Sequence, residues 1–136
     1  MSMATRKYLS RSSLQTKQIA SRCASRVSQP TVLTLTGNLG AGKTVFAKGF
    51  IDYFGIKKGV VSPTFALLKQ YHLHNKLWEN WTIYHFDLYR LKRADDFINE
   101  GFLDIFSRPR SIVIIEWPEI IENLLLSHMT SLSGNI

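Results

Sequence analysis

The sequence has 136 residues, of which 45% are apolar and 20% charged, as in a globular protein with one hydrophobic core. Its net charge of +7 would suit a nucleic-acid or anionic-membrane partner. However, residues 1–29 hold six basic residues and no acid, whereas residues 30–136 hold 11 bases and 10 acids. The excess charge is therefore a property of one segment.

Composition excludes several classes of protein. A transmembrane helix needs about 20 consecutive apolar residues, and no run in the sequence approaches that length. Cys23 is the only cysteine, which excludes a disulfide framework and a cysteine-based zinc site. We therefore expect a cytoplasmic protein without a membrane partner. The Arg- and Ser-rich residues 1–29 also have the composition of a mitochondrial transit peptide.

The first predicted element is an amphipathic helix over about residues 13–27. Ser12 suits the N-cap, with Gln15 at the third helical position. Apolar residues recur at close to helical period, and basic residues occupy the opposite face. Because this stripe ends directly before a strand, it favours an element of the domain over a transit peptide.

A strand, a glycine-rich turn and a helix follow. The strand is predicted over Thr31–Thr36, and the helix over Lys43–Tyr53. Residues 37–44 between them read GNLGAGKT and match the Walker A pattern G-x-x-x-x-G-K-[ST]. In such a loop the backbone amides surround an anion, Lys43 reaches phosphate oxygens, and the Thr44 hydroxyl binds Mg²⁺. The alternative is a glycine-rich turn that binds nothing.

The rest of the chain is predicted to alternate strands and helices. Gly101 is a weak point in the second predicted helix. The elements are a short strand and loop over 60–65, a hairpin of strands over 66–73 and 81–87, a helix over 95–106, a buried strand over 111–115, and one or two helical turns within 119–136.

Three polar residues after strands are candidates for the chemistry of the site. Glu116 follows four apolar residues, forming a Walker B-like segment over 112–116 that would supply the second Mg²⁺ anchor. Asp87 ends a strand and would polarise water or bind Mg²⁺ through a water, or else only form a turn. Thr64, in a switch-like segment over 61–65, would sense the terminal phosphate, or else satisfy its own turn.

Together with the Walker A segment, four further motifs occur in a characteristic order and spacing. By these motifs the chain, over roughly residues 8–119, resembles the bacterial TsaE (YjeE) family of ATPases in tRNA threonylcarbamoyladenosine synthesis. The motifs are Leu35–Thr44, Val61–Phe65, Tyr84–Leu91, Asn99–Phe102 and Ile115–Glu119.

The resemblance implies an α/β fold, a P-loop NTPase-like three-layer domain over residues 1–136 with a mixed, mainly parallel sheet. It implies binding of ATP and Mg²⁺, slow hydrolysis by the chain alone, and association with TsaD and TsaB, through which the chain would act on tRNA indirectly. The implied catalytic residues are Asp87, Lys43 and Thr64, and the implied metal ligands are Thr44 and Glu116. The implied nucleotide-binding residues are Asn38, Leu39, Gly40, Ala41, Gly42, Lys43, Thr44 and Trp117.

Two departures from the family pattern affect these expectations. Asn38 stands where the family usually has Asp or Glu, which removes a charge near the phosphates. The family also continues further beyond the last motif with additional strands, whereas 17 residues follow Glu119 here, so C-terminal strands are expected to be missing. Three alternative functions stay open: a nucleotide-gated docking module with incidental hydrolysis, a small-molecule P-loop kinase, and direct nucleic-acid binding through the basic N-terminal helix.

Overall fold

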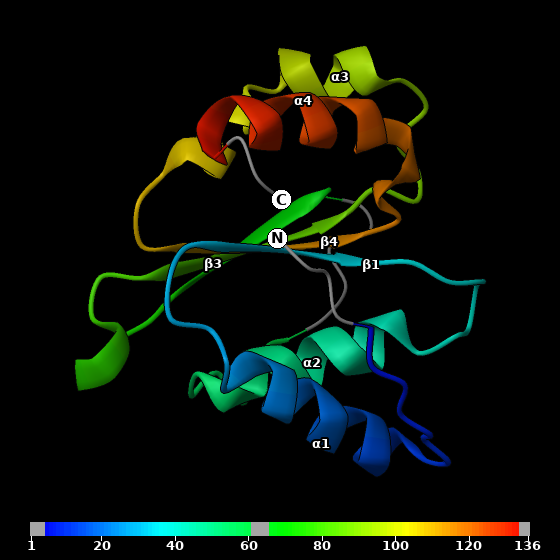
Figure 1. Ribbon diagram of the computed structural model, residues 1–136, viewed down its shortest axis with the longest axis vertical. Coiled ribbons are helices and arrows are strands. Elements are labelled where there is room, and N and C mark those ends of the chain that lie inside the picture. The colour runs from blue at the N-terminus through cyan, green and yellow to red at the C-terminus, as the bar shows by residue number, and fades with distance from the viewer. Residues whose placement is uncertain (1–4, 61–65, 134–136) are drawn as a thin grey trace.

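In the computed structural model, residues 5–60 and 66–133 are described, with side chains as far as residue 128. A four-stranded sheet lies between two layers of helices (Figure 1). Helices α1 (Ser13–Ala24) and α2 (Lys43–Tyr53) cover one face of the sheet, while α3 (Ala94–Asn99) and α4 (Glu122–Ser133) cover the other. The predicted α/β class is confirmed.

The sheet is mixed and mostly parallel, as predicted. Its strands are β1 (Thr31–Leu35), β2 (Leu68–His72), β3 (Thr82–Asp87) and β4 (Ser111–Glu116), in the order β1-β4-β3-β2. The pairs β1–β4 and β4–β3 are parallel, and β2 pairs with β3 as the predicted antiparallel hairpin. The carboxyl ends of three strands therefore lie at one edge.

The core has two parts, one on each face of the sheet. On the first face, Ile83 and Ile114 pack against Phe50 of α2, and on the second, Phe86 and Ile115 pack with aromatic side chains from 97–106. Every residue of β4 is buried, as expected for a central strand covered on both faces. This explains why its apolar run is continuous rather than alternating.

The N-terminal helix α1 ends at Ala24, three residues earlier than predicted. The amides of the next turn bond to carbonyls three residues back, Val27 to Ala24 among them, so the chain tightens out of α-geometry. Ser12 caps the helix, accepting from the amide of Gln15 at 3.1 Å. The side-chain Oε1 of Gln15 accepts from the backbone amide of Arg11, and not from the Ser12 amide that a capping box would use.

Two predictions for the second half of the chain are wrong. The helix expected over 95–106 is divided at Gly101, which has a φ of +79° and separates α3 from the 3₁₀ helix η2 (Phe102–Ser107). The tail is more helical than expected: a 3₁₀ helix, η3 (Pro118–Ile121), leads into the twelve-residue α4, whose Leu125 is buried beside Ile121. Among the described residues after β4 there is no strand.

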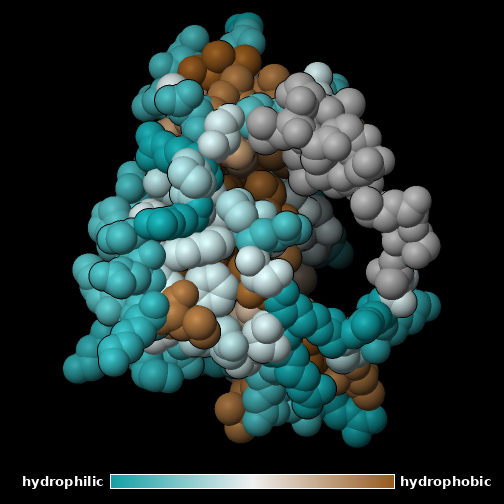
Figure 2. All heavy atoms as spheres, turned by 60° about the vertical axis from the view of Figure 1, so that its left-hand side comes forward, coloured by the Kyte–Doolittle hydropathy of each residue, from teal (hydrophilic) through white to brown (hydrophobic). Residues whose placement is uncertain are grey.

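One face of the molecule is mainly hydrophilic. Figure 2 shows this face, on which hydrophobic side chains gather at the top and in smaller areas between hydrophilic ones. Within residues 5–60 and 66–133, no helix has the length and hydrophobicity needed to cross a bilayer.

Helices α1 and α2 approach each other closely at Gly49. A methyl group at this position would lie 2.6 Å from Cα and 2.8 Å from the carbonyl oxygen of Lys17, and these backbone atoms cannot rotate away. We expect Gly49→Ala to lower the free energy of unfolding by about 2 kcal/mol, a typical cost of overpacking, measured by urea denaturation. Lys48→Ala, on the same helix, should change it by less than about 0.5 kcal/mol. An unchanged value for Gly49→Ala would contradict the close packing.

Candidate functional site

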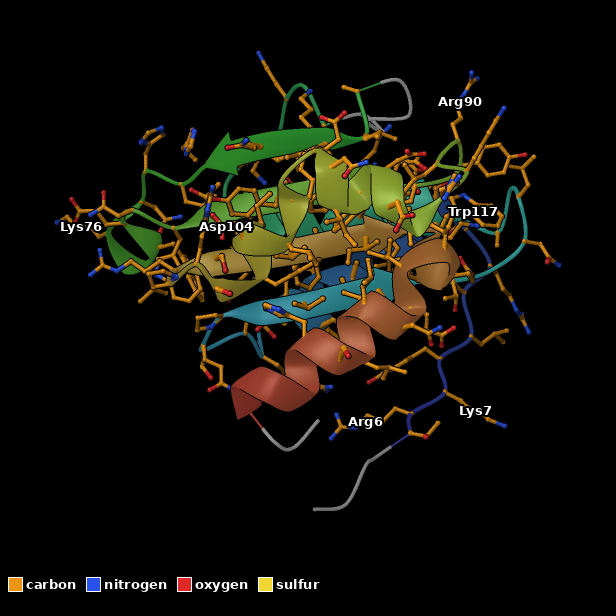
Figure 3. The ribbon with its side chains drawn as sticks, turned by 90° about the horizontal axis from the view of Figure 1, so that it is seen from above. Arg6, Lys7, Lys76, Arg90, Asp104 and Trp117 are labelled. Carbon is orange, nitrogen blue, oxygen red and sulfur yellow. The ribbon has the colours of Figure 1, made fainter. Side chains whose placement is uncertain are left out.

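The candidate site lies where the carboxyl ends of β1, β3 and β4 meet the N-terminus of α2. In-register pairing places Leu35 and Asp87 on either side of Glu116, so the ends of the three strands are adjacent. A cavity of about 460 Å³ opens at this edge. Figure 3 shows Arg90 and Trp117, which both line the cavity, at the opposite end of the molecule from Lys76 and Asp104.

The glycine-rich loop between β1 and α2 forms one wall of the cavity. Gly40 and Gly42 have φ values of +80° and +101°, a left-handed conformation that other residues adopt only with strain. The amide of Ala41 bonds to the carbonyl of Asn38 at 3.0 Å and closes a turn. Because Gly42 is the N-cap of α2 and provides no side chain, the first amides of the helix are left open to an anion.

Lys43 presents a nearly buried cation to the cavity. Its side chain is only 9% exposed, and its Nζ donates to the carbonyl oxygens of Gly37 and Asn38 at 2.7 and 2.8 Å. The ammonium also lies 4.0 Å from the centroid of the Trp117 ring, within the range of a cation–π contact. These neutral partners are weaker acceptors than an anionic oxygen, so the ammonium can transfer its hydrogen bonds to a phosphate.

A buried carboxylate lies beside the start of α2. Glu116 is 2% exposed, and its two oxygens have different partners. The Thr44 hydroxyl donates to Oε1 at 2.8 Å, and Nε2 of His85 lies 2.7 Å from Oε2. Glu116 is therefore a buried acid with a polar partner at each oxygen, and not an exposed acid at the end of its strand.

Asp87 and Trp117 complete the polar and aromatic lining. Asp87 is 5% exposed, and its Oδ1 accepts from the amide of Tyr89 at 3.1 Å, the turn-forming bond weighed from the sequence. Its carboxylate nevertheless lines the cavity. Trp117 has a left-handed backbone with a φ of +57°, and its ring centroid lies 5.0 Å from that of Tyr89. Its ring therefore both packs and borders the cavity.

The structure brings most of the predicted site residues to this cavity. Leu39, Gly40, Gly42, Lys43, Thr44, Asp87, Glu116 and Trp117 all line it. Asn38 and Ala41, although part of the described loop, are not among the lining residues, and Ala41 borders a smaller neighbouring hollow. Thr64 and the rest of segment 61–65 lie outside the described residues.

The sequence interpretation missed His85 and Tyr89. A signal for His85 was present: it lies two residues before Asp87 in a strand, and so on the same face of the sheet. What the sequence did not reveal is that β3 lies next to β4, which brings His85 within reach of Glu116.

Two oxygen-bearing side chains near the start of α2 are of the chemical type that binds Mg²⁺. Mg²⁺ prefers oxygen ligands, keeps several waters, and is usually held by one or two protein groups together with substrate phosphates. The Thr44 hydroxyl and the Glu116 carboxylate supply two such oxygens side by side. In the described part of the chain, no three His, Cys, Asp or Glu side chains are grouped as a metal site, so an all-protein cage is not found there.

The fold and cavity define an α/β protein with a glycine-rich loop, a lysine and a threonine at the start of a helix. The family model described as "Threonylcarbamoyl adenosine biosynthesis protein TsaE" matches residues 10–135. This chain belongs to the TsaE family, whose role is in tRNA threonylcarbamoyladenosine biosynthesis.

Individual relatives agree with this assignment. The chain is 40% identical over 112 residues to "tRNA threonylcarbamoyladenosine biosynthesis protein TsaE" of Rickettsia conorii, covering 82% of this chain and 60% of that protein. It is 38% identical over 111 residues to the protein of the same name from Bacillus subtilis, covering 82% and 65%. The crystal structure of YdiB from Bacillus subtilis superposes with a TM-score of 0.59 at 34% identity, covering 84% of this chain and 65% of that one. The chain thus spans less than two thirds of the length of these proteins.

Proposed function

We propose that this chain is an Mg²⁺-dependent P-loop ATPase that acts with the TsaD–TsaB pair in the threonylcarbamoyladenosine modification of tRNA. The pair, and not this chain, would hold the tRNA. The chain would function in the cytoplasm, which its single cysteine suits.

The observation that carries the proposal is the convergence of three groups at the N-terminus of α2. Lys43 supplies a nearly buried positive charge, the loop glycines leave helix amides open, and Thr44 lies in hydrogen-bond contact with the buried Glu116. The anionic oxygens of a triphosphate would bind to Lys43 and to the helix amides. The Mg²⁺ that accompanies a triphosphate would bind to Thr44 and Glu116. A glycine-rich turn that binds nothing would not require a lysine and a glutamate, both charged, to be buried beside it.

Each lining residue has a distinct task in this proposal. Lys43 and the loop amides would hold phosphate oxygens, with Trp117 flanking the ammonium. Thr44 and Glu116 would hold Mg²⁺, which neutralises phosphate charge when it is bound. Asp87, at the end of β3, would orient and deprotonate the attacking water. Thr64 remains the proposed sensor of the terminal phosphate.

Loss of the lysine tests nucleotide binding. We expect Lys43→Ala to weaken ATP binding by roughly 10–100-fold, because charge-assisted hydrogen bonds contribute about 1.5–3 kcal/mol. Isothermal titration calorimetry with ATP and Mg²⁺ measures the change. Lys48 lines a different hollow, so Lys48→Ala is the matched control. This variant should bind ATP as tightly as the wild type does. Equal affinity for ATP in all three proteins would contradict the proposed site.

A pull-down with purified TsaD and TsaB tests the proposed partners. The chain should be retained with ATP and Mg²⁺, and the Lys43→Ala variant should be retained less. Failure of the wild-type chain to bind in both the presence and absence of ATP would refute the partnership without affecting the nucleotide site.

A further inference from the structure

His85 is a buried polar residue to which the proposed function gives no task. It is wholly buried in β3, on the face of the sheet covered by α1 and α2. Its register partners are Ile114 in β4 and Lys69 in β2, and Ile83 precedes it by two residues on the same face. The two isoleucines offer the ring only apolar contact, and the Lys69 ammonium donates to the carbonyl oxygen of Gly59 instead of to the ring.

The two nitrogens of the His85 ring have different environments. Nε2 lies 2.7 Å from Oε2 of Glu116, whereas Nδ1 is buried and has no hydrogen-bond partner among the described residues. An ionised carboxylate only accepts hydrogen bonds, so this contact assigns the proton to Nε2. With a proton on Nε2 and none on Nδ1, the ring avoids burying an unpaired N–H donor.

Packing does not explain a histidine at this position. Burying a polar ring with one unpaired nitrogen costs free energy, and an aliphatic side chain would fill the same space without that cost. What histidine adds is one hydrogen bond, the one to Glu116. The role of His85 therefore depends on how this hydrogen bond affects the Glu116 carboxylate.

The bond fixes the carboxylate from the side away from Thr44. Oε1 of Glu116 faces the Thr44 hydroxyl and Oε2 faces His85, so donors from α2 and β3 hold the two oxygens. Thr44 and Glu116 are both proposed metal ligands, so their mutual hydrogen bond is one that a cation would compete with. The bond from His85 uses the other oxygen and is free of that competition.

We infer that His85 is a positioning residue whose Nε2–H holds the Glu116 carboxylate with Oε1 toward Thr44, ready to receive Mg²⁺. This inference rests on the proposed function. Outer-shell hydrogen-bond partners of this kind typically change metal affinity by roughly 10–100-fold when they are removed. The effect of His85 should therefore be seen in the magnesium dependence of nucleotide binding and not in nucleotide binding as such.

The test compares His85→Leu and His85→Gln with the wild-type chain by calorimetric titration of ADP, with Mg²⁺ and with EDTA. In the wild type, Mg²⁺ should strengthen ADP binding. In His85→Leu this strengthening should fall by roughly 10–100-fold, while the affinity in EDTA stays at the wild-type value. Glutamine can place an amide donor near the position of Nε2, so His85→Gln should recover most of the strengthening.

The outcomes separate this inference from the proposed function. If the wild type shows no strengthening by Mg²⁺, both fail. If His85→Leu retains the full strengthening, or loses affinity equally in EDTA, the positioning role is wrong while the nucleotide site stands.

Two further measurements apply even if circular dichroism shows that His85→Leu does not fold. His85→Asn carries the same amide on a side chain one methylene shorter, so it should lack the strengthening that His85→Gln keeps, and equal behaviour would overturn the inference. Nitrogen-15 NMR of the wild-type chain without nucleotide should show the His85 proton on Nε2. A proton on Nδ1 alone would also overturn it.

Discussion

Replacing Asp87 with Asn is expected to lower the rate of ATP hydrolysis by roughly 10²–10⁴-fold, the range that general acid–base catalysis contributes, with ATP affinity close to that of the wild type. Asparagine keeps the size of the side chain and an oxygen to accept from the amide of Tyr89, so the turn after β3 should persist. It lacks the basic carboxylate that would take a proton from water. Phosphate release at saturating ATP, together with calorimetric ATP binding, measures both quantities.

Asp95→Asn is the control for this experiment. Asp95 is exposed, pairs with Arg93 at 3.2 Å and is not among the residues that line the cavity, so its replacement should leave hydrolysis unchanged. If Asp87→Asn hydrolyses ATP at the wild-type rate, Asp87 is a turn former and not the base. If hydrolysis is lost but tRNA modification persists, the docking-module alternative explains the chain better than the enzymatic one.

The second large effect is expected for Glu116→Gln. The amide can still accept from His85 and donate to the Thr44 hydroxyl, so the two contacts of the native side chain can be replaced. The negative charge that would bind Mg²⁺ is lost. We expect ATP hydrolysis to fall by roughly 10²–10³-fold, as is typical when one electrostatic group is removed from a reaction site, and Mg²⁺ no longer to strengthen nucleotide binding.

Glu119→Gln provides the matched control. Glu119 is exposed, lies three residues further along the chain, and borders a separate hollow beside β1. Its variant should hydrolyse ATP and respond to Mg²⁺ as the wild type does. A Glu116→Gln protein that still binds nucleotide more tightly with Mg²⁺ than with EDTA would remove Glu116 from the metal site.

The parts of the fold set by local pattern were predictable from the sequence. Four apolar residues before Glu116 indicated a buried strand ending in an acid, and β4 has that form. The glycines and Lys43 likewise indicated a turn that enters a helix. In both cases the residues that decide the structure are neighbours in the sequence, so no knowledge of the sheet order was needed.

Features that depend on tertiary packing were not predictable. Gly101 was recognised as a weak point, but a left-handed backbone at that residue, set by packing of both flanking helices on Phe86, divides the predicted helix. The length of α4 depends on a core position for Leu125. His85 acquired its partner only through the adjacency of β3 and β4. Asn38 holds Lys43 through its backbone carbonyl oxygen, a contact that depends on the fold of the loop and that the identity of the side chain does not indicate.

The structure also bears on the basic N-terminal segment. In Figure 3, Arg6 and Lys7 lie apart from Arg90 and Trp117, which border the cavity. The positive charge at the cavity comes from Lys43 and Arg90, not from the segment that gives the chain most of its net charge of +7. The overall charge is therefore no guide to how the proposed site binds phosphate.

If the proposed function is right, tRNA modification requires the nucleotide cavity of this chain. The most direct measurement is the threonylcarbamoyladenosine content of tRNA, by mass spectrometry of nucleosides, in bacteria depleted of their own TsaE and supplied with this chain. We predict that the wild-type chain restores the modified nucleoside and that Lys43→Ala, expressed at the same level, does not. Equal restoration by both proteins would contradict the claim.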